Sequence, residues 1–217
     1  MRIAVITEGS TKHRNADILR ALSHFPEHEV FNLGMQNREG EPELSYLETG
    51  TMSALLLNLK AVDMVIGGCG TGQGYMNAVL QFPGVACGLL LDPVDAWLFA
   101  QVNAGNCISL ALNKGYGGVG ADINLRYLLE RLFQDPFGEG YPAHRKSIQQ
   151  AARQKLAALS LTAHRSCVEI LAGMDRQVLR QVLTFPGFRE AVASAPEELD
   201  TAAGALKRTL LEALDKC

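Results

Sequence analysis

Short apolar runs alternate with helical stretches through the first two thirds of the chain, and this alternation limits the possible folds more than any other feature. The runs are rich in Val, Ile, Leu and Ala and have the length of buried strands. The predicted strands cover residues 2–7, 28–33, 61–67, 85–91 and 107–112. The predicted helices that follow them cover residues 15–24, 47–60, 75–80, 94–102 and 123–133. This order is typical of βαβ units, so we expect a doubly wound, three-layer α/β/α fold with a parallel, Rossmann-like sheet of about five strands.

The character of the chain changes after Tyr141 and Pro142. From residue 147 onward the pattern is helical only, with amphipathic stripes of alanine and leucine. We therefore divide the chain into an α/β domain, residues 1–146, and a helical C-terminal extension, residues 147–217. The extension carries no chemical motif, and we expect it to serve packing or oligomerisation.

Charge, hydropathy and cysteine content exclude several classes of protein. A net charge of −3 over 217 residues gives no electrostatic attraction to nucleic acid. No apolar run approaches the roughly 18 residues of a membrane span, and the N-terminus does not have the long apolar stretch of a signal peptide. The five cysteines are odd in number and form no CxxC pair, which indicates free thiols and neither a disulfide framework nor a zinc site. We expect a cytoplasmic protein without metal, membrane or nucleic-acid partners.

A glycine-rich loop follows the third predicted strand, at the sheet edge where open α/β proteins bind ligands. Residues 67–74 contain five glycines, a composition that suits a backbone approached closely by a ligand. Successive N–H groups at the start of a helix form an anion site. The phosphate-binding P-loop is not matched, because its lysine is absent, and Tyr75 takes the place of the last glycine of the dinucleotide fingerprint. Asp92 at a later strand end keeps a nucleotide- or dinucleotide-binding protein as an alternative.

Cys69 lies in this loop, and we expect it to lie beyond the end of the strand, among backbone N–H donors. An electropositive setting of this kind favours the thiolate form of a cysteine. Thr71, two residues further on, is close enough in sequence to hydrogen-bond the sulfur. A thiolate beside N–H donors suits proton abstraction next to a carbonyl, where an enediolate oxygen needs stabilisation. A small apolar cysteine of the core is the alternative, and the residues alone leave both open.

The chain resembles the ribose-5-phosphate isomerase B and galactose-6-phosphate isomerase family over about residues 1–145. Four segments carry the resemblance: Cys69-Gly70-Thr71-Gly72-Gln73-Gly74, Phe82-Pro83-Gly84-Val85, Asp92-Pro93 and Asn103-Ala104-Gly105-Asn106. It implies an enzyme of carbohydrate metabolism that uses no cofactor and interconverts an aldose and a ketose phosphate of the ribose-5-phosphate type. Such an enzyme is an intramolecular oxidoreductase. The resemblance also implies a homodimer or homotetramer with active sites near the subunit interface.

The resemblance assigns roles to individual residues. It implies that Cys69 moves a proton between C1 and C2, that Thr71 supports the thiol, and that the loop amides hold the enediolate. Glu8 and Tyr46 are implied to contact the sugar. Asn103 is implied to bind substrate hydroxyls and Arg145 the phosphate, with contributions that cross the dimer interface. The implied substrate-binding residues are Gly70, Gly72, Gln73, Gly74, Tyr46, Asn103 and Arg145.

The chain departs from the pattern of the family after the glycine-rich loop, where Ala78-Val79-Leu80-Gln81 replaces the usual AANK stretch, and at three positions that bear on the chemistry. Gly9 and Val102 stand where the family has histidines, and Tyr141 stands where a second phosphate-binding arginine is expected. Histidines commonly open the sugar ring, and arginines bind phosphate with two parallel hydrogen bonds. We therefore expect ring opening to fall to Glu8, or the substrate to differ from ribose 5-phosphate. A non-catalytic sugar-phosphate binder is a further alternative.

Overall fold

The structure, a computed structural model, describes residues 1–114, 120–196 and 201–216. Its centre is a five-stranded sheet with the strand order β2-β1-β3-β5-β4, and every pair of neighbouring strands is parallel. The strands are β1 (Arg2–Ile6), β2 (Glu29–Asn32), β3 (Met64–Cys69), β4 (Cys87–Leu90) and β5 (Cys107–Ala111). The predicted parallel α/β sheet is confirmed.

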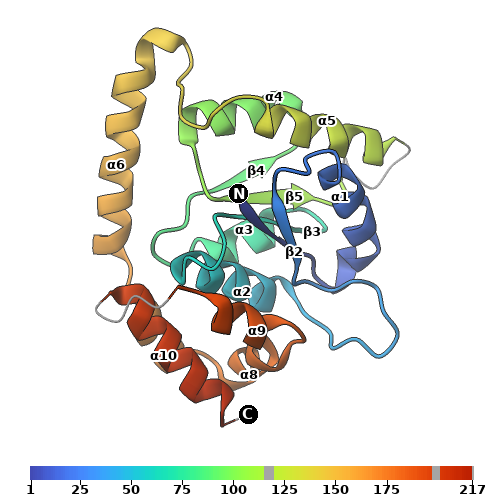
Figure 1. The fold of residues 1–217 in the computed structure, drawn as a ribbon, viewed down its shortest axis with the longest axis vertical. Helices are drawn as coiled ribbons and strands as arrows, with labels where there is room; N and C mark the ends of the chain where they lie inside the picture. The colour runs from blue at the N-terminus through green and yellow to red at the C-terminus, as the bar shows by residue number, and fades with distance from the viewer. Residues whose placement is uncertain (115–119, 197–200, 217) are drawn as a thin grey trace.

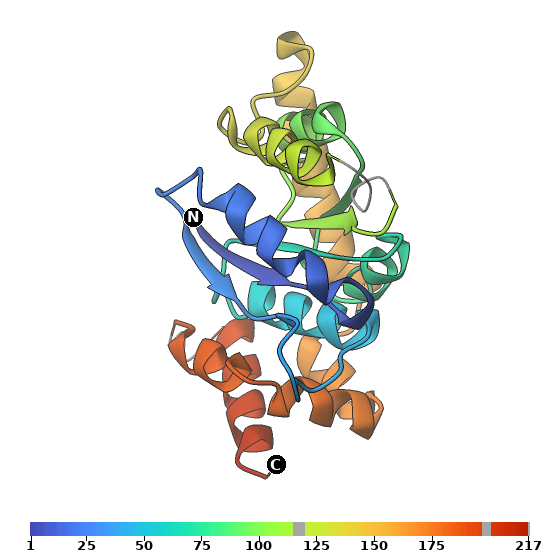
Figure 2. The same cartoon turned by 90° about the vertical axis from the view of Figure 1, so that its right-hand side faces the viewer.

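Helices cover both faces of this sheet, as Figures 1 and 2 show. One face carries α1 (Asn15–Leu22), α4 (Pro93–Leu98) and α5 (Ala121–Phe133), whose apolar residues share a core with the sheet. The other face carries α2 (Tyr46–Asn58) and α3 (Gln73–Val79). The chain also forms three shorter helical segments in its described part: η1 (Gly9–Arg14), the π-helical η2 (Phe99–Asn103) and, after α5, η3 (Ala143–Arg145).

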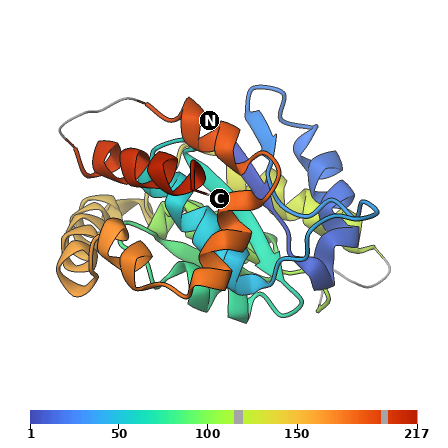
Figure 3. The ribbon, with the colours of Figure 1, turned by 90° about the horizontal axis from the view of Figure 1, so that it is seen from below.

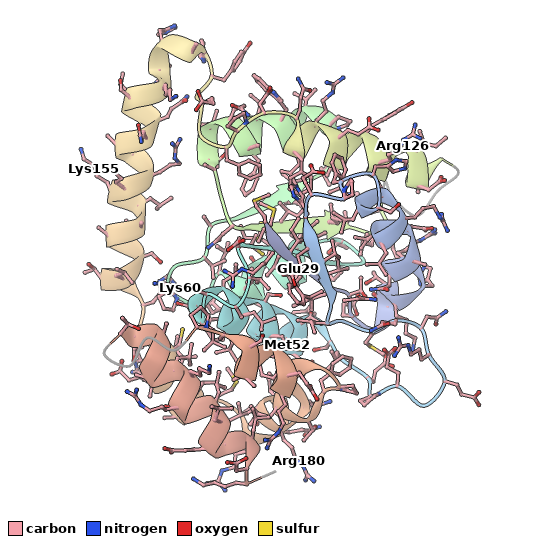
Figure 4. All side chains as sticks on the ribbon, in the orientation of Figure 1. Glu29, Met52, Lys60, Arg126, Lys155 and Arg180 are labelled. Atoms are coloured by element: carbon pink, nitrogen blue, oxygen red, sulfur yellow. The ribbon has the colours of Figure 1, made fainter. Side chains whose placement is uncertain are left out.

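The helix α2 is buried on nearly every side. All of its residues from Glu48 to Leu57 are buried, and a helix that is apolar all round needs partners on both faces. The sheet and α3 cover one face, while α8 (Arg176–Thr184) and α9 (Phe188–Ser194) pack on another. The helices α7 (Cys167–Gly173) and α10 (Ala202–Leu214) complete this group, which Figure 3 shows in front of α2. The C-terminal helices thus share one apolar core with α2, and the side chain of Met52 lies where the two layers meet (Figure 4).

The helix α6 (Lys146–Ala163) differs from the other helices because none of its residues is buried. It stands along one side of the molecule in Figure 1, and the Lys155 side chain points away from the body in Figure 4. Hydrogen bonds hold it near β4 and η2, from the Gly84 N–H to Ser160 Oγ at 3.2 Å and from Arg153 to the Val102 carbonyl at 2.9 Å. Four large apolar side chains of α6 are exposed: Ile148, Leu156, Leu159 and Leu161. Among the described residues, no helix combines the length and the apolar character that a membrane crossing requires.

Candidate active site

Three loops meet at the carboxyl edge of the sheet, after β1, β3 and β5. Asn113, which follows β5, ties them together. Its side-chain amide donates to the Ser10 carbonyl at 3.1 Å, and its backbone N–H donates to the Gly70 carbonyl at 3.0 Å. The central strands therefore bring the turn after β1 next to the glycine-rich loop, as expected for the ligand edge of an open sheet.

Cys69 is the last residue of β3, in register with Ala111 of β5. The expectation that Cys69 has already left the strand is therefore wrong: the parallel ladder continues through two glycines to the cysteine. The reason is close packing, because a Cβ atom on Gly68 would lie 2.3 Å from the Leu110 carbonyl oxygen. Cys69 keeps 7% of its surface exposed, and its Sγ lies 4.0 Å from Thr71 Oγ1, which places the predicted pair together.

The glycine-rich loop turns directly into α3 through Gly72, whose φ of +74° favours glycine. The Gly72 N–H donates to the Cys69 carbonyl at 3.1 Å, and the Gln73 N–H donates to Thr71 Oγ1 at 3.4 Å. Two of the five backbone amides of residues 70–74 are therefore already used. Within the described ranges, the N–H groups of Gly70, Thr71 and Gly74 donate to no acceptor of the chain, so these three remain for an anionic oxygen.

Glu8 lies in the turn after β1 and is only 6% exposed. Its carboxylate accepts hydrogen bonds from the Ser10 N–H at 2.8 Å, from Ser10 Oγ at 2.5 Å and from Thr11 Oγ1 at 3.2 Å. Hydrogen bonds to a charged acceptor are the stronger ones, so these donors fix the orientation of the carboxylate. Glu8 thus presents a fixed carboxylate that is bonded to Ser10, the residue whose carbonyl accepts from Asn113.

Tyr46 is the first residue of α2, and its ring lies against the glycine-rich loop. A Cβ atom on Gly74 would come within 3.1 Å of Tyr46 Cγ, so the glycine allows the ring to approach the backbone. A capping box fixes the start of the helix, because the Ser45 N–H and hydroxyl both donate to Glu48. The structure thus brings Tyr46 to the loop that carries Cys69.

Asn103 and Arg145 do not join this group within one chain. Asn103 ends η2 ahead of β5, so it lies at the amino edge of the sheet, whereas Cys69 lies at the carboxyl edge. A strand of this length spans roughly 17 Å, which separates the two edges. Arg145 ends η3 just before α6 and is exposed.

Asn103 instead borders a pocket of about 460 Å³ between α6 and the β4 side of the sheet. The lining is mainly apolar and includes Val85, Phe99 and Leu156. Arg153 of α6 also lines the pocket, and its guanidinium donates to the carbonyls of Val102 and Gly138 at 2.9 and 3.3 Å. This pocket is separate from Cys69 in the single chain.

Sequence reasoning missed two residues of the site, Ser10 and Asn113. A serine two residues after an acidic side chain is a signal for a local hydrogen-bonded turn, and an asparagine directly after a buried strand is a signal for the ligand edge. Asp92, the acidic residue of the nucleotide alternative, instead caps α4 and accepts from the N–H groups of Val94 and Asp95 at 2.8 and 2.9 Å. In the described part of the chain, no group of three or more His, Cys, Asp or Glu side chains is arranged to hold a metal ion.

Residues 3–149 match the model of the Ribose/Galactose Isomerase family. A solved 4-deoxy-L-threo-5-hexosulose-uronate ketol-isomerase, complexed with a tartrate, is 39% identical to this chain, with a TM-score of 0.91 and coverage of 100% of both chains. A ribose-5-phosphate isomerase from Vibrio parahaemolyticus is 37% identical, with a TM-score of 0.87 and coverage of 96% of this chain and 99% of its own.

A more distant structure shows the fold alone. The type B ribose 5-phosphate isomerase from Trypanosoma brucei is 19% identical, with a TM-score of 0.60, and covers 73% of this chain and 97% of its own. No curated protein matches the chain. The family model extends over more than half of the sequence, through every strand and the loop that carries Cys69, and the chain therefore belongs to the ribose/galactose isomerase family of sugar isomerases.

Proposed function

We propose that this protein is an aldose–ketose isomerase that acts on a small anionic sugar through an enediolate, with Cys69 as the base. The observation that carries the proposal is the grouping at the carboxyl edge: Cys69 beside Thr71, three loop amides without an acceptor in the described chain, and the fixed Glu8 carboxylate in the adjoining turn. Membership of a family of sugar isomerases supports it.

The reaction can be written with the residues of this edge. The Cys69 thiolate takes the proton from C2 of the open aldose, the C1–C2 double bond forms, and the carbonyl electrons move to O1. The N–H groups of Gly70, Thr71 and Gly74 stabilise the negative oxygen as its charge develops. The Cys69 thiol then returns the proton to C1 while O2 becomes a carbonyl. Glu8 takes the hydroxyl proton from O2 and returns it to O1. The product has the same atoms and electrons as the substrate, so this chemistry needs no cofactor.

We propose further that a second copy of the chain completes the site, in a cytoplasmic homodimer. Two observations support this arrangement. Asn103 lies at the opposite edge of the sheet from Cys69, and α6 carries four exposed apolar side chains without a buried residue. Contiguous exposed apolar surface marks interaction sites. In this arrangement Asn103 binds sugar hydroxyls in the partner's site, and Arg145 binds the anionic end of the sugar.

A heterodimer with two different tags tests the shared site. One subunit carries Cys69→Ala and the other Asn103→Ala, and we expect each variant to be inactive as a homodimer. If the site is shared, one of the two sites in the heterodimer is intact, and about half of the wild-type activity returns. An inactive heterodimer would contradict the shared site, and so would an active Asn103→Ala homodimer.

Two anionic sugars are candidate substrates. The first is a phosphorylated sugar of the ribose-5-phosphate type, in line with the name of the Vibrio parahaemolyticus protein. The second is a ketouronate, in line with the name of the relative that matches over its full length. A 4-deoxy-5-hexosulose uronate has no hydroxyl group on C4 or C5, so its C1 aldehyde cannot form the furanose or pyranose ring of an ordinary aldose.

The ketouronate fits the residues of this chain better. A substrate that forms no aldose furanose or pyranose ring needs no histidine to open one, and Gly9 and Val102 replace the two histidines of the family pattern. A carboxylate also carries less charge than a phosphate, which agrees with Tyr141 in place of an arginine. We therefore place the ketouronate ahead of ribose 5-phosphate.

A substrate panel in deuterated water tests this choice. Ribose 5-phosphate, a 4-deoxy-5-hexosulose uronate, AMP and NAD are compared for thermal stabilisation, and the two sugars also for deuterium uptake and ketose formation by NMR. We expect uptake and product with the ketouronate. Binding without exchange would indicate a non-catalytic binder, and stabilisation by AMP or NAD alone would indicate the nucleotide-binding alternative.

A further inference from the structure

The C-terminal helices reach the turn that carries Glu8 through the segment between β2 and α2, residues 33–45, which we name the β2–α2 loop. We infer that the extension holds this loop in place and that Gln181 on α8 is a positioning residue for the catalytic edge. The side-chain amide of Gln181 donates to the Glu43 carbonyl at 3.4 Å. The next carbonyl, that of Leu44, accepts from the Gly9 N–H at 2.9 Å, directly beside Glu8.

The β2–α2 loop depends on such contacts because it contains no helix or strand of its own. Long loops without secondary structure are uncommon in compact domains and usually functional. Both of its ends are bonded to the segment after β1. At one end, the Met35 N–H donates to the Thr7 carbonyl at 2.9 Å and the Thr7 hydroxyl donates to the Met35 carbonyl at 2.5 Å. At the other end, the Gly9–Leu44 hydrogen bond is joined by an ion pair between Lys12 and Glu43 at 3.2 Å.

The extension covers the same loop from the other side. Leu33, Met35 and Leu44 belong to one buried cluster with Phe185 and Phe188, at the end of α8 and the start of α9. A Cβ atom on Gly187, between the two phenylalanines, would lie 3.4 Å from Leu33 Cδ2, so the segment between α8 and α9 packs against the loop. The half-buried Gln181 adds a polar contact to the backbone of the loop. The extension therefore contacts the β2–α2 loop through apolar packing and through one side-chain hydrogen bond.

The position of this loop affects both sides of the candidate site. The end of the loop at Leu44 accepts from the Gly9 amide, directly after Glu8, and leads two residues later into Tyr46, whose ring lies over Gly74. A shift of the loop therefore moves a proton-transfer group and a sugar-contacting ring together. This gives the C-terminal extension a role in the geometry of the edge, beyond packing. The kinetic part of this inference rests on the proposed isomerase function, whereas the structural part does not.

The test uses the full-length protein with Gln181→Met, which keeps the volume of the side chain and removes its N–H donor. Gln177→Met, one turn earlier on the exposed face of α8, is the matched control. We expect the Gly9 amide and the β2–α2 loop to exchange hydrogen for deuterium roughly two- to fivefold faster in Gln181→Met, the range for loss of one weak hydrogen bond. The melting temperatures of both variants should match that of the wild type.

The kinetic part of the test uses the sugar that the wild type isomerises. Because Glu8 takes part in proton transfer, we expect Gln181→Met to lower kcat by a similar factor and to change KM less, and Gln177→Met to change neither. Unchanged exchange in Gln181→Met would overturn the inference, and so would faster exchange with an unchanged kcat. If the wild type isomerises no sugar of the panel, the proposed function fails, and the exchange measurement alone decides whether Gln181 holds the loop.

Discussion

Replacement of Cys69 by serine tests the proposed chemistry most directly. Serine retains a small side chain at the end of β3, but its hydroxyl does not ionise near neutral pH and cannot act as the base. A general base contributes typically about 10²- to 10⁴-fold to a rate, so we expect kcat to fall by that factor. This loss corresponds to about 3–5 kcal/mol of transition-state stabilisation.

The fold should tolerate this substitution. Cys69 is 7% exposed, and the Thr71 hydroxyl lies 4.0 Å from its sulfur, so a serine hydroxyl reaches this partner only after a small movement of either side chain. Loss of the apolar surface of one buried sulfur costs about 1 kcal/mol of unfolding free energy. Cys167 in α7 is also 7% exposed and provides a matched control. Cys167→Ser should cost a similar amount of stability and leave kcat unchanged.

The assay follows solvent deuterium at C2 of the substrate by NMR, alongside urea unfolding of both variants. The expected result is loss of exchange in Cys69→Ser alone, with similar unfolding midpoints for the two variants. Retention of more than about a tenth of the wild-type exchange rate in Cys69→Ser would refute the role of the sulfur as base. Equal losses in both variants would also refute it, because the effect would then come from packing.

Three further predictions concern single groups. Ser10→Ala removes the hydroxyl that donates to the Glu8 carboxylate at 2.5 Å, and we expect steady-state kinetics to show kcat lowered about tenfold; an unchanged kcat would contradict the role of Glu8. Tyr75→Phe leaves the buried Ser53 hydroxyl without its donor at 2.7 Å, which should lower the unfolding free energy in urea by about 1 kcal/mol; an unchanged midpoint would contradict this reasoning. Burial raises the pKa of the Cys167 thiol from 9.0 to about 11, so the folded protein retains a proton that the unfolded chain releases. This group therefore contributes stability that is complete below pH 9 and lost as the pH rises through about 11, and Cys167→Ala should flatten that decline in urea midpoints; an equal decline in the variant would contradict the prediction.

The sheet was predictable because its central strands are buried along their whole length. Every residue of β3 and β5 is buried, and such strands read as continuous apolar runs. The first and last residues of the strands were less predictable. The predicted strand 61–67 begins too early because Ala61 and Val62 are apolar and buried in the turn before β3. It ends too early because glycine is unusual inside a strand, although here it allows the close approach of β5.

The parts of the site that lie close together in sequence were predictable from spacing. Cys69 and Thr71 are two residues apart, so the turn alone brings them together. The contact between Ser10 and Asn113 joins residues 103 positions apart and depends on the order of the strands. The contact between Gln181 and Glu43 spans 138 positions and depends on the packing of α8 and α9 over the buried helix α2. No local pattern encodes contacts of this kind, because tertiary packing decides them.

The positions of Asn103 and Arg145 show a different limit of reasoning from one sequence. The sheet fixes Asn103 at the amino end of β5 and Cys69 at the carboxyl end of β3, and these two strands are direct neighbours. A rearrangement of loops cannot close a gap of roughly 17 Å that is set by the rise of the strands themselves. Asn103 therefore either acts in the site of a second copy or has no part in binding the sugar. Because both copies have the same sequence, the residues alone cannot show which copy supplies a side chain, whereas the tagged heterodimer separates the two cases.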